Sequence, residues 1–223
     1  MSNTSFAVYL IDDDIHVLKA LTRLLRAAGY EPQAFVSASD FLKAHDPSTP
    51  GCAIVDFAMP ELDGLALQKK LIESTAERPI IFLSGQSDIA ISVRAMHAGA
   101  IDFLVKPVDK ASLLKAVALA AARDQAARTA RKVREEIVAR FRTLTPREFE
   151  VLVHVIAGRL NKQIAADLGT VEKTIKVHRS RMMEKIGIHT VAELVRLTES
   201  IGLGPSQPKV ARRRRGAETE ACL

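Results

Sequence analysis

The stretch FAVYLIDDD, residues 6–14, joins six consecutive apolar residues to three aspartates. An apolar run of this length is typical of a strand that a parallel sheet buries on both faces. The residues just beyond the carboxyl ends of parallel strands gather along one edge of the sheet, where ligands bind. We therefore expect the carboxylates of Asp12 and Asp13 at such an edge.

Three further apolar runs in the first half of the chain also read as buried strands that end in polar residues. Each run is followed by a side chain that can bind a metal ion or a phosphoryl group: 52–55 by Asp56, 80–83 by Ser84, and 101–105, which Asp102 interrupts, by Lys106 and then Pro107. Carboxylates, a hydroxyl and an amine would thus meet in one small volume. Such a set is the outline of a site for phosphoryl transfer.

Helical patterns alternate with these strands over residues 1–122, which favours a doubly wound α/β domain built on a parallel sheet. A fifth strand is expected at 31–36, at an edge of the sheet, because no residue of catalytic type follows it. Asp14 is expected to cap the first helix rather than to bind a ligand. The helices of this domain are expected at 14–28, 38–44, 65–74, 89–98 and 110–122.

The segment 111–139 is rich in alanine and charged residues and contains no Gly or Pro, which predicts one long helix. It would be the last helix of the first domain, continuing as a linker. Its apolar positions, such as Val133 and Ile137, could support a partner helix, and a plain solvated linker fits the pattern equally well.

The rest of the chain reads as a small all-helical domain followed by a tail. Its four helices are expected to start at the N-cap Thr145, at the N-cap Asn161, at Thr170 or Val171, and at Thr190, and to end near 157, 168, 186 and 201. Beyond Gly204 the chain has two prolines and four consecutive arginines without apolar periodicity. A disordered basic tail is therefore expected over 204–223.

The net charge of +6 is divided unequally along the chain. Residues 1–120 contain 11 Lys and Arg against 14 Asp and Glu, a net charge of −3, and the remaining 21 and 12 give +9. An acidic half joined to a basic half suggests that the second half meets a polyanion such as DNA. The four arginines of the tail contribute to this charge, so the charge alone does not decide the point.

Composition indicates a cytoplasmic protein of about two domains. The two cysteines, Cys52 in an expected buried strand and Cys222 near the end, are poor disulfide partners and lack the spacing of metal ligands, which favours a reducing compartment. The first five residues have no basic segment of a secretory signal, and no apolar stretch is long enough to span a membrane.

The chemistry of the expected site follows from its residue types. The carboxylates of Asp12, Asp13 and Asp56 would repel one another unless a cation lay between them, and Mg²⁺ is a hard cation that prefers such oxygens. Asp56 can attack phosphorus and form an aspartyl-phosphate. Ser84 and Lys106 would bind the other phosphoryl oxygens, and a cis bond between Lys106 and Pro107 could turn the lysine inward.

Over residues 6–122 the sequence resembles the receiver domain of two-component response regulators, which have a flavodoxin-like fold with a five-stranded parallel sheet. The resemblance rests on the pair Asp12-Asp13, on Ile54-Val55-Asp56 followed by Met59-Pro60 and Gly64, on Ser84-Gly85, and on Ala98-Gly99-Ala100-Ile101-Asp102-Phe103 before Lys106-Pro107. It implies that Asp56 is the phosphoacceptor and that Asp13, Asp56 and the backbone carbonyl of Ala58 bind Mg²⁺, with Asp12 acting mainly through water. It also implies that Phe103 is a switch residue that moves together with Ser84.

A phosphohydrolase of the haloacid dehalogenase type is a different class with similar residues. The stretch Asp12-Asp13-Asp14 contains the spacing of its nucleophile motif. His16, however, stands where that motif has Thr or Val, only Asp109 follows Lys106 as an acidic ligand, and Asp56 would have no role. We therefore expect an acceptor that holds a phosphoryl group rather than an enzyme that turns over.

The helices expected at 161–168 and 171–186, joined by a tight turn that contains glycine, have the spacing of a helix-turn-helix. The second of them carries Lys173, Lys176, Arg179, Arg181 and Lys185. The motifs Leu144-Thr145-Pro146-Arg147-Glu148, Val151-Leu152, Ala157-Gly158, Asn161-Lys162-Gln163-Ile164-Ala165 and Thr174-Ile175-Lys176-Val177-His178 resemble the LuxR-type DNA-binding domain. The resemblance implies that Lys176, Val177 and Ser180 face bases, that Asn161, Lys162, Thr174 and Arg179 touch phosphates, and that His178 is packed inside.

The two resemblances together are those of a FixJ/NarL-type transcription factor. The expected organisation is a receiver domain at 1–122, a helical linker at 123–141, a LuxR-type domain at 142–203 and the tail at 204–223. The resemblance implies a sensor histidine kinase, promoter DNA and RNA polymerase as partners, and a homodimer on phosphorylation. A regulator that acts by protein contact alone, without specific DNA binding, is the alternative that the sequence leaves open.

Overall fold

A computed structural model of the chain describes residues 6–60, 64–73, 78–85 and 89–203. The chain forms two compact units, and the boundary between Ala130 and Arg131 lies inside one long helix. In the described residues no helix combines the length and the apolar character that a membrane span requires. The tail expected at 204–223 lies outside the described residues.

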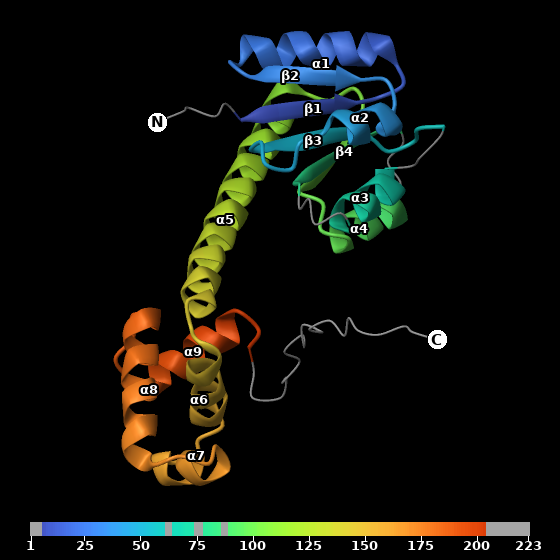
Figure 1. Ribbon diagram of the computed structural model, residues 1–223. Coiled ribbons are helices and arrows are strands. Elements are labelled where there is room, and N and C mark those ends of the chain that lie inside the picture. Colours follow the sequence, from blue (N-terminus) through green and yellow to red (C-terminus); the bar gives the residue numbers. More distant parts are fainter. Residues whose placement is uncertain (1–5, 61–63, 74–77, 86–88, 204–223) are drawn as a thin grey trace, which may run out of the picture. The chain divides into compact units, whose positions relative to one another are not determined.

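The first unit is built on a parallel sheet of five strands in the order β2-β1-β3-β4-β5, which confirms the predicted fold class (Figure 1). The strands are β1 Ala7–Ile11, β2 Glu31–Phe35, β3 Gly51–Asp56, β4 Ile80–Ser84 and β5 Asp102–Val105. Every residue of β1, β3 and β4 is buried, as their continuous apolar sequences predict. β2 lies at an edge of the sheet, also as predicted.

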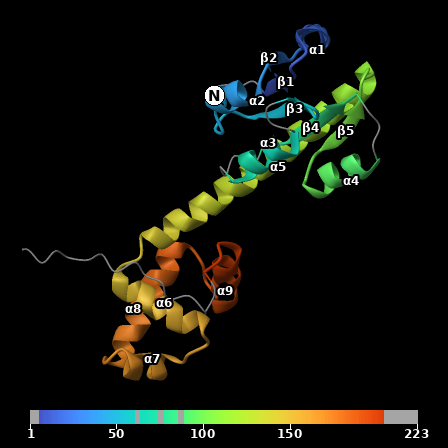
Figure 2. The ribbon, with the colours of Figure 1, turned by 90° about the vertical axis from the view of Figure 1, so that its right-hand side faces the viewer.

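The prediction that the last strand, β5, is buried on both faces was wrong. β5 begins at Asp102 rather than Ile101, its first three residues are half-buried, and Val105 is 45% exposed. β5 occupies the edge of the sheet opposite to β2, beside β4, so it cannot be covered on every side (Figure 2). The polar Asp102 that interrupts its apolar run is the sequence signal for this position.

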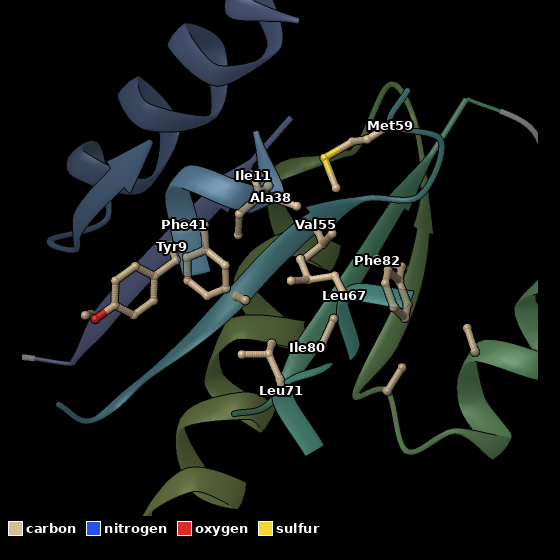
Figure 3. Close-up of a cluster of buried hydrophobic side chains, with 14 residues drawn as sticks. Tyr9, Ile11, Ala38, Phe41, Val55, Met59, Leu67, Leu71, Ile80 and Phe82 are labelled. Atoms are coloured by element: carbon tan, nitrogen blue, oxygen red, sulfur yellow. The ribbon is translucent and has the colours of Figure 1, made fainter. Parts of the chain in front are cut away.

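Side chains of each central strand alternate between two apolar layers, one on each face of the sheet. In β1, Tyr9 and Ile11 point into the layer that Figure 3 shows, together with Phe41 of α2 Ala38–Ala44 and Leu67 of α3 Gly64–Glu73. α4 Ile89–His97 adds the buried Ala95 to the same layer. α2, α3 and α4 therefore cover one face of the sheet.

The other face of the sheet is covered by the first and the last helix of the unit. Val8 and Leu10 of β1 pack there with Leu25 of α1 Ile15–Ala27 and with Leu113 of α5 Lys110–Arg142. Each large apolar side chain buried in this way stabilises the fold by about 1.5–3 kcal/mol. Asp14 caps α1 by accepting a hydrogen bond from the His16 N–H at 2.8 Å, which confirms its predicted role.

The predicted long helix is confirmed, because α5 runs without a break over 33 residues. Its first half belongs to the apolar layer shared with α1, where Ala116, Val117 and Ala120 are buried. Its last turns belong to the second unit, in which Phe141 is buried and Arg134 donates to the Ile201 carbonyl at 3.3 Å. A solvated linker therefore describes only part of the segment after Ala120.

Four further helices pack around one apolar core in the second unit. Figure 2 shows how these helices are arranged. They are α6 Pro146–Ile156, α7 Asn161–Asp167, α8 Glu172–Ile186 and α9 Val191–Ser200. Thr145 and Glu148 form the capping box that the sequence predicts for α6, and Thr190 caps α9. Val171 is the N-cap of α8, which settles the alternative left open between Thr170 and Val171.

Asn161 does not cap α7, and this prediction was wrong. The N-cap residue is Leu160, whose backbone N–H donates to the Gln163 side chain at 2.9 Å. Asn161 is the first helical residue, and its side chain accepts a hydrogen bond from Arg179 of α8 at 3.0 Å. A contact between residues 18 positions apart has no local signature in the sequence.

A polar cluster is buried at the edge of the sheet where the strands begin. Arg78, 8% exposed, donates from Nε to His45 Nε2 at 2.6 Å and from Nη2 to the carbonyls of Asp46 and Thr49 at 2.9 and 3.0 Å. Its guanidinium also lies 4.8 Å from the centre of the Tyr9 ring. Burial and the charge of Arg78 lower the pKa of His45 to about 4, so the imidazole is neutral at pH 7 and accepts the bond.

The free energy of unfolding of the first unit should fall between pH 7 and pH 5. The unfolded chain binds a proton at His45 near pH 6.5 and the folded chain near pH 4, so this contribution is complete above pH 6.5 and is lost as the pH falls toward 4. Asp46 and Arg78 are the charged groups facing His45, and the ring is partly exposed, so we expect a loss of about 1 kcal/mol. Urea unfolding followed by tyrosine fluorescence measures it, because Tyr9 and Tyr30 both lie in the first unit.

His45→Gln is the matched control for this pH dependence. Its carboxamide oxygen can still accept the hydrogen bond from Arg78, but it does not titrate. Its stability should therefore depend less on pH than that of the unchanged protein. Parallel pH profiles of the two proteins would show that His45 does not carry the effect.

Candidate phosphoryl-acceptor site and nucleic-acid interface

Three carboxylates meet at the edge of the sheet where the strands end. Asp12 directly follows β1 and Asp56 is the last residue of β3, and these strands are neighbours with Ile11 paired to Val55. One oxygen each of Asp12, Asp13 and Asp56 lies within 4.8 Å of the others. Asp12 and Asp56 are 2% and 6% exposed, whereas Asp13 is open to solvent. The structure thus brings together the acidic residues that the sequence singled out.

Lys106 neutralises part of this charge. Its Nζ lies 2.6 Å from Asp12 Oδ2 and 2.7 Å from Asp56 Oδ1. Partial burial would lower the pKa of Lys106, but its hydrogen bonds to Asp12 and Asp56 together raise it, so the amine stays charged. Burial raises the pKa of the Asp12 carboxyl, and the bond from Lys106 opposes this shift. One ammonium against three carboxylates leaves an excess of negative charge that suits a divalent cation.

The other predicted site residues lie around Asp56. The Ala58 N–H donates to Asp56 Oδ2 at 3.2 Å, and Ala58 itself is exposed. Ser84 is the last residue of β4, is 7% exposed, and accepts a hydrogen bond from the Lys106 N–H at its carbonyl, at 2.8 Å. The peptide bond between Lys106 and Pro107 is cis, as predicted. Ala58 after β3 and Lys106 after β5 thus contact the Asp56 carboxylate, and Ser84 ends the strand that pairs with β3.

Phe103 of β5 packs against the apolar layer that α2, α3 and α4 cover. Its half-buried ring lies 5.8 Å from the ring of Phe57 and 6.5 Å from that of Phe82, measured between centroids. Phe57 directly follows Asp56, and its N–H donates to the Leu83 carbonyl next to Ser84. Aromatic contacts therefore connect β5 to the residues beside Asp56 and Ser84.

The second unit presents a separate polar face on α8. Ile175, Met182 and Ile186 are buried in the core, while Lys176, Val177 and Ser180 are exposed on the helix. Lys176 Nζ lies 3.1 Å from Glu172 one turn earlier. The three residues expected to face bases are therefore all exposed to solvent, as contact with a groove of DNA would require.

The residues expected to touch phosphates differ from one another in their exposure to solvent. Lys162 is exposed at the start of α7, whereas Asn161, Thr174 and Arg179 are half-buried. Arg179 and Asn161 are hydrogen-bonded to each other, which joins α7 to α8. His178 is half-buried, in agreement with its expected place inside the domain.

Lys185 is one of the five basic residues that the sequence places on α8, but it forms an ion pair inside the domain. Its Nζ lies 2.6 Å from Glu148, which is 3% exposed and belongs to the capping box of α6. The hydrogen bonds from Lys185 and from the Thr145 N–H lower the pKa of Glu148, so its carboxylate stays ionised. Lys185 therefore ties α8 to α6, and the Glu148 position in the helix-start motif gave no indication of its partner.

The structure also contains a polar contact that the sequence did not predict. Asp124 of α5 is 3% exposed and is bound to Arg128 and to the Gly51 N–H. The spacing of four residues between Asp124 and Arg128 is a recognisable helical pair. The contact of Asp124 with the start of β3, 73 residues earlier, has no local signal in the sequence.

The predicted core position of Cys52 is confirmed, and burial raises the pKa of its thiol to about 12.

A parallel α/β unit with an acidic, lysine-containing edge, followed by a helix-turn-helix unit, defines a class of regulator that couples a receiver domain to DNA binding. Residues 8–118 match the model of the response regulator receiver domain, and residues 142–198 match that of the bacterial regulatory proteins of the luxR family. The two matches fall in the two halves of the chain where the sequence motifs were found.

Similar proteins support the same class. The chain is 39% identical over 202 residues to nodulation protein W of Bradyrhizobium diazoefficiens, covering 91% of this chain and 89% of that protein. It is 36% identical over 196 residues to the transcriptional regulatory protein FixJ of the same organism, with 88% and 96% covered. The structure of the response regulator StyR matches with a TM-score of 0.72 and 40% identity, covering 87% of this chain and 98% of that one.

The chain belongs to the FixJ/NarL-type two-component response regulators, with a receiver domain and a LuxR-type DNA-binding domain. Members of this family regulate transcription by binding DNA and are not enzymes. The alternative of a phosphohydrolase of the haloacid dehalogenase type is not favoured, because both halves of the chain match the regulator families.

Proposed function

We propose that Asp56 accepts a phosphoryl group from a sensor histidine kinase and that this phosphorylation controls binding of the protein to promoter DNA. The position of Asp56 carries the proposal: it ends β3, its Oδ1 lies 2.7 Å from Lys106 Nζ, and Asp12 and Asp13 lie beside it. Response regulators as a class pair with sensor kinases and bind DNA, which supports both halves of the proposal.

The acidic residues around Asp56 fit a bound Mg²⁺ ion. Asp13 and Asp56, with the Ala58 carbonyl, would bind the ion directly, and Asp12 would act mainly through water. One oxygen of each of the three carboxylates lies within 4.8 Å of the others, and Lys106 is the ammonium group paired with Asp12 and Asp56. The negative charge of the carboxylates exceeds the charge of this one amine, so a divalent cation would be attracted to the site. When bound, the ion would neutralise phosphoryl oxygens during the transfer.

The residues around Asp56 would respond to its phosphorylation. Phosphorylation of Asp56 would form an acyl phosphate, a mixed anhydride. The carboxylate charge that Lys106 now contacts at 2.7 Å would be replaced by charge on the phosphoryl oxygens, so the ammonium would bind one of these oxygens instead. The Ser84 hydroxyl would bind another of these oxygens. Phe103 packs against Phe57 and Phe82, so a movement of Ser84 and Lys106 would pass through this ring to β5.

Phosphorylation is proposed to promote a homodimer through the face made by α4, β5 and α5. This face exposes apolar side chains that a partner could cover: Ile89, Val93, Met96, Val105 and Leu119 are between 45% and 80% exposed. Paired DNA-binding domains would then meet paired half-sites on the promoter.

Treatment with a small phosphodonor and Mg²⁺ should raise the dimer fraction measured by sedimentation velocity. The apolar side chains of the α4, β5 and α5 face supply the free energy of association when they are buried. Ile89→Ser, at an 80% exposed position, should reduce this dimer fraction without preventing phosphate uptake. A protein that takes up phosphate and stays monomeric would remove dimerisation from the proposal.

The exposed face of α8 is proposed to contact promoter DNA, with RNA polymerase as the later partner and the cytoplasm as the compartment. Lys176, Val177 and Ser180 would face bases, and Lys162, Asn161, Thr174 and Arg179 would lie near phosphates. The half-buried bond between Arg179 and Asn161 suggests that these two act mainly by holding α7 against α8. A regulator that acts by protein contact alone would leave the exposed face of α8 without a function.

A further inference from the structure

The apolar packing of α5 on the first unit ends before the helix does. Leu113, Ala116, Val117 and Ala120 are buried against the sheet. Among the ten residues from Ala121 to Ala130, all of them described, Asp124 alone is buried. Polar contacts, rather than the apolar core, therefore fix this part of α5 to the first unit.

Asp124 is held by two donors. Its Oδ2 accepts a hydrogen bond from the Gly51 N–H at 3.3 Å and from Arg128 Nε at 2.7 Å. A carboxylate that is 3% exposed needs such partners, because an unpaired buried charge is costly. The bond to Gly51 ties α5 to the first residue of β3.

Arg128 holds the loop that precedes β3. Its Nη1 donates to the Ser48 carbonyl at 2.7 Å, and its Nη2 donates to the carbonyls of Pro47 and Thr49 at 3.1 and 2.7 Å. The planar guanidinium can reach several acceptors at once, which a single ammonium group cannot do in the same geometry. Arg128 thus donates four hydrogen bonds, and its side chain is 28% exposed.

The loop that Arg128 holds is itself fixed to the sheet. The Thr49 carbonyl also accepts a hydrogen bond from the buried Arg78 at 3.0 Å. A side chain at Gly51 would clash with the Ala7 carbonyl and would place its Cβ 2.8 Å from Arg78 Nη1. The backbone around Gly51 therefore fits closely between β1 and Arg78, and α5 is anchored to a rigid part of the unit.

We propose that Asp124 and Arg128 form a helix clamp, in which they hold α5 to residues 47–51, and that phosphorylation-dependent DNA binding requires this clamp. α5 is the covalent connection between the two units, since its residues up to Ala130 belong to the first and the rest to the second. If α5 were not fixed to the first unit after Ala120, local unfolding of the helix there would absorb a displacement of its first half. The displacement would then not reach the second unit. The second part of this inference rests on the proposed function.

Hydrogen–deuterium exchange of the full-length protein tests the clamp directly. Arg128→Ala should speed exchange of the backbone amides of residues 122–130 by about tenfold, because the helix there loses its main tertiary contacts. Asp124→Asn should act in the same direction. Arg123→Ala is the matched control, because Arg123 is exposed on the same helix and makes no hydrogen bond or ion pair within the described residues. Unchanged exchange in Arg128→Ala would overturn the clamp.

The effect on signalling is measured by DNA affinity with and without a small phosphodonor and Mg²⁺. The probe is the genomic fragment that the phosphorylated protein enriches most strongly. Arg128→Ala should take up phosphate normally, while its gain in affinity on phosphorylation should be at least about threefold smaller than that of the unchanged protein and of Arg123→Ala. An equal gain in all three would overturn the role of the clamp in signalling. An unchanged protein that shows no gain would instead contradict the proposed function, and the exchange experiment would still decide whether the clamp holds α5.

Discussion

Asp56→Asn is expected to abolish labelling of the protein by small phosphodonors. The substituted amide has nearly the same shape, and its oxygen can still accept the Ala58 N–H, which now lies 3.2 Å from Asp56 Oδ2. It lacks, however, the anionic oxygen that attacks phosphorus. Intact-mass spectrometry should find one phosphate per chain on the unchanged protein and none on the variant.

Two controls distinguish this result from a general loss of the site. Asp14→Asn changes an exposed carboxylate that caps α1, and an Asn cap should preserve both the fold and the labelling. Removal of Mg²⁺ with a chelator should suppress the labelling of the unchanged protein, because the remaining carboxylates would repel the incoming phosphoryl group. Labelling that survives in Asp56→Asn would refute the assignment of the acceptor.

Lys176→Ala is expected to weaken binding to a specific promoter by roughly 5–150-fold, the range for loss of a good base contact. Lys176 is exposed in the first half of α8, and the carboxylate of Glu172, 3.1 Å away, holds its amine near the surface of the helix. The exposed pair contributes little to folding, so the variant should keep its stability. Its affinity for unrelated DNA should fall much less.

Lys162→Ala provides the contrast to this base contact. Lys162 is exposed at the start of α7, and we expect its positive charge to meet phosphates rather than bases. Its loss should weaken binding to specific and unrelated DNA alike and should reduce the dependence of the affinity on salt by about one unit of slope. Equal losses on both kinds of DNA for Lys176→Ala would show that Lys176 does not read bases.

The sequence predicted most of the fold because the decisive signals are local. β1, β3 and β4 are continuous apolar runs, α5 is a long segment without Gly or Pro, and Thr145 with Glu148 is a helix-start motif. The edge position of β5 weakened its pattern, and Asp102 was the visible sign of it.

The candidate site could be predicted for a related reason. A parallel sheet brings the ends of its strands together, so Asp12, Asp56, Ser84 and Lys106 could be placed at one edge from their positions after apolar runs. Contacts between residues far apart had no such rule. Asn161 was predicted to be the N-cap of α7, but its side chain accepts a hydrogen bond from Arg179 instead. Lys185 was counted among the basic residues of α8, but its amine pairs with Glu148 of α6.

The buried polar contacts at the other edge of the sheet were beyond sequence reasoning. His45, Arg78 and Asp124 have no distinctive local sequence. Arg78 contacts His45, 33 residues earlier, and Asp124 contacts Gly51, 73 residues earlier. Arg78 and Arg128 both donate to backbone carbonyls of the loop before β3, which no side-chain pattern marks. Asp124 and Arg128 of α5, the helix that connects the two units, are hydrogen-bonded to the same part of the chain at Gly51 and at residues 47–49.

The most direct test of the central claim is capture and sequencing of genomic DNA fragments by the full-length protein in three states. These are the protein treated with phosphodonor and Mg²⁺, the untreated protein, and Asp56→Asn treated in the same way. We predict that the treated protein enriches a small set of promoter fragments and that the other two do not. The same fragments enriched equally by Asp56→Asn, or no specific enrichment in any state, would contradict the account.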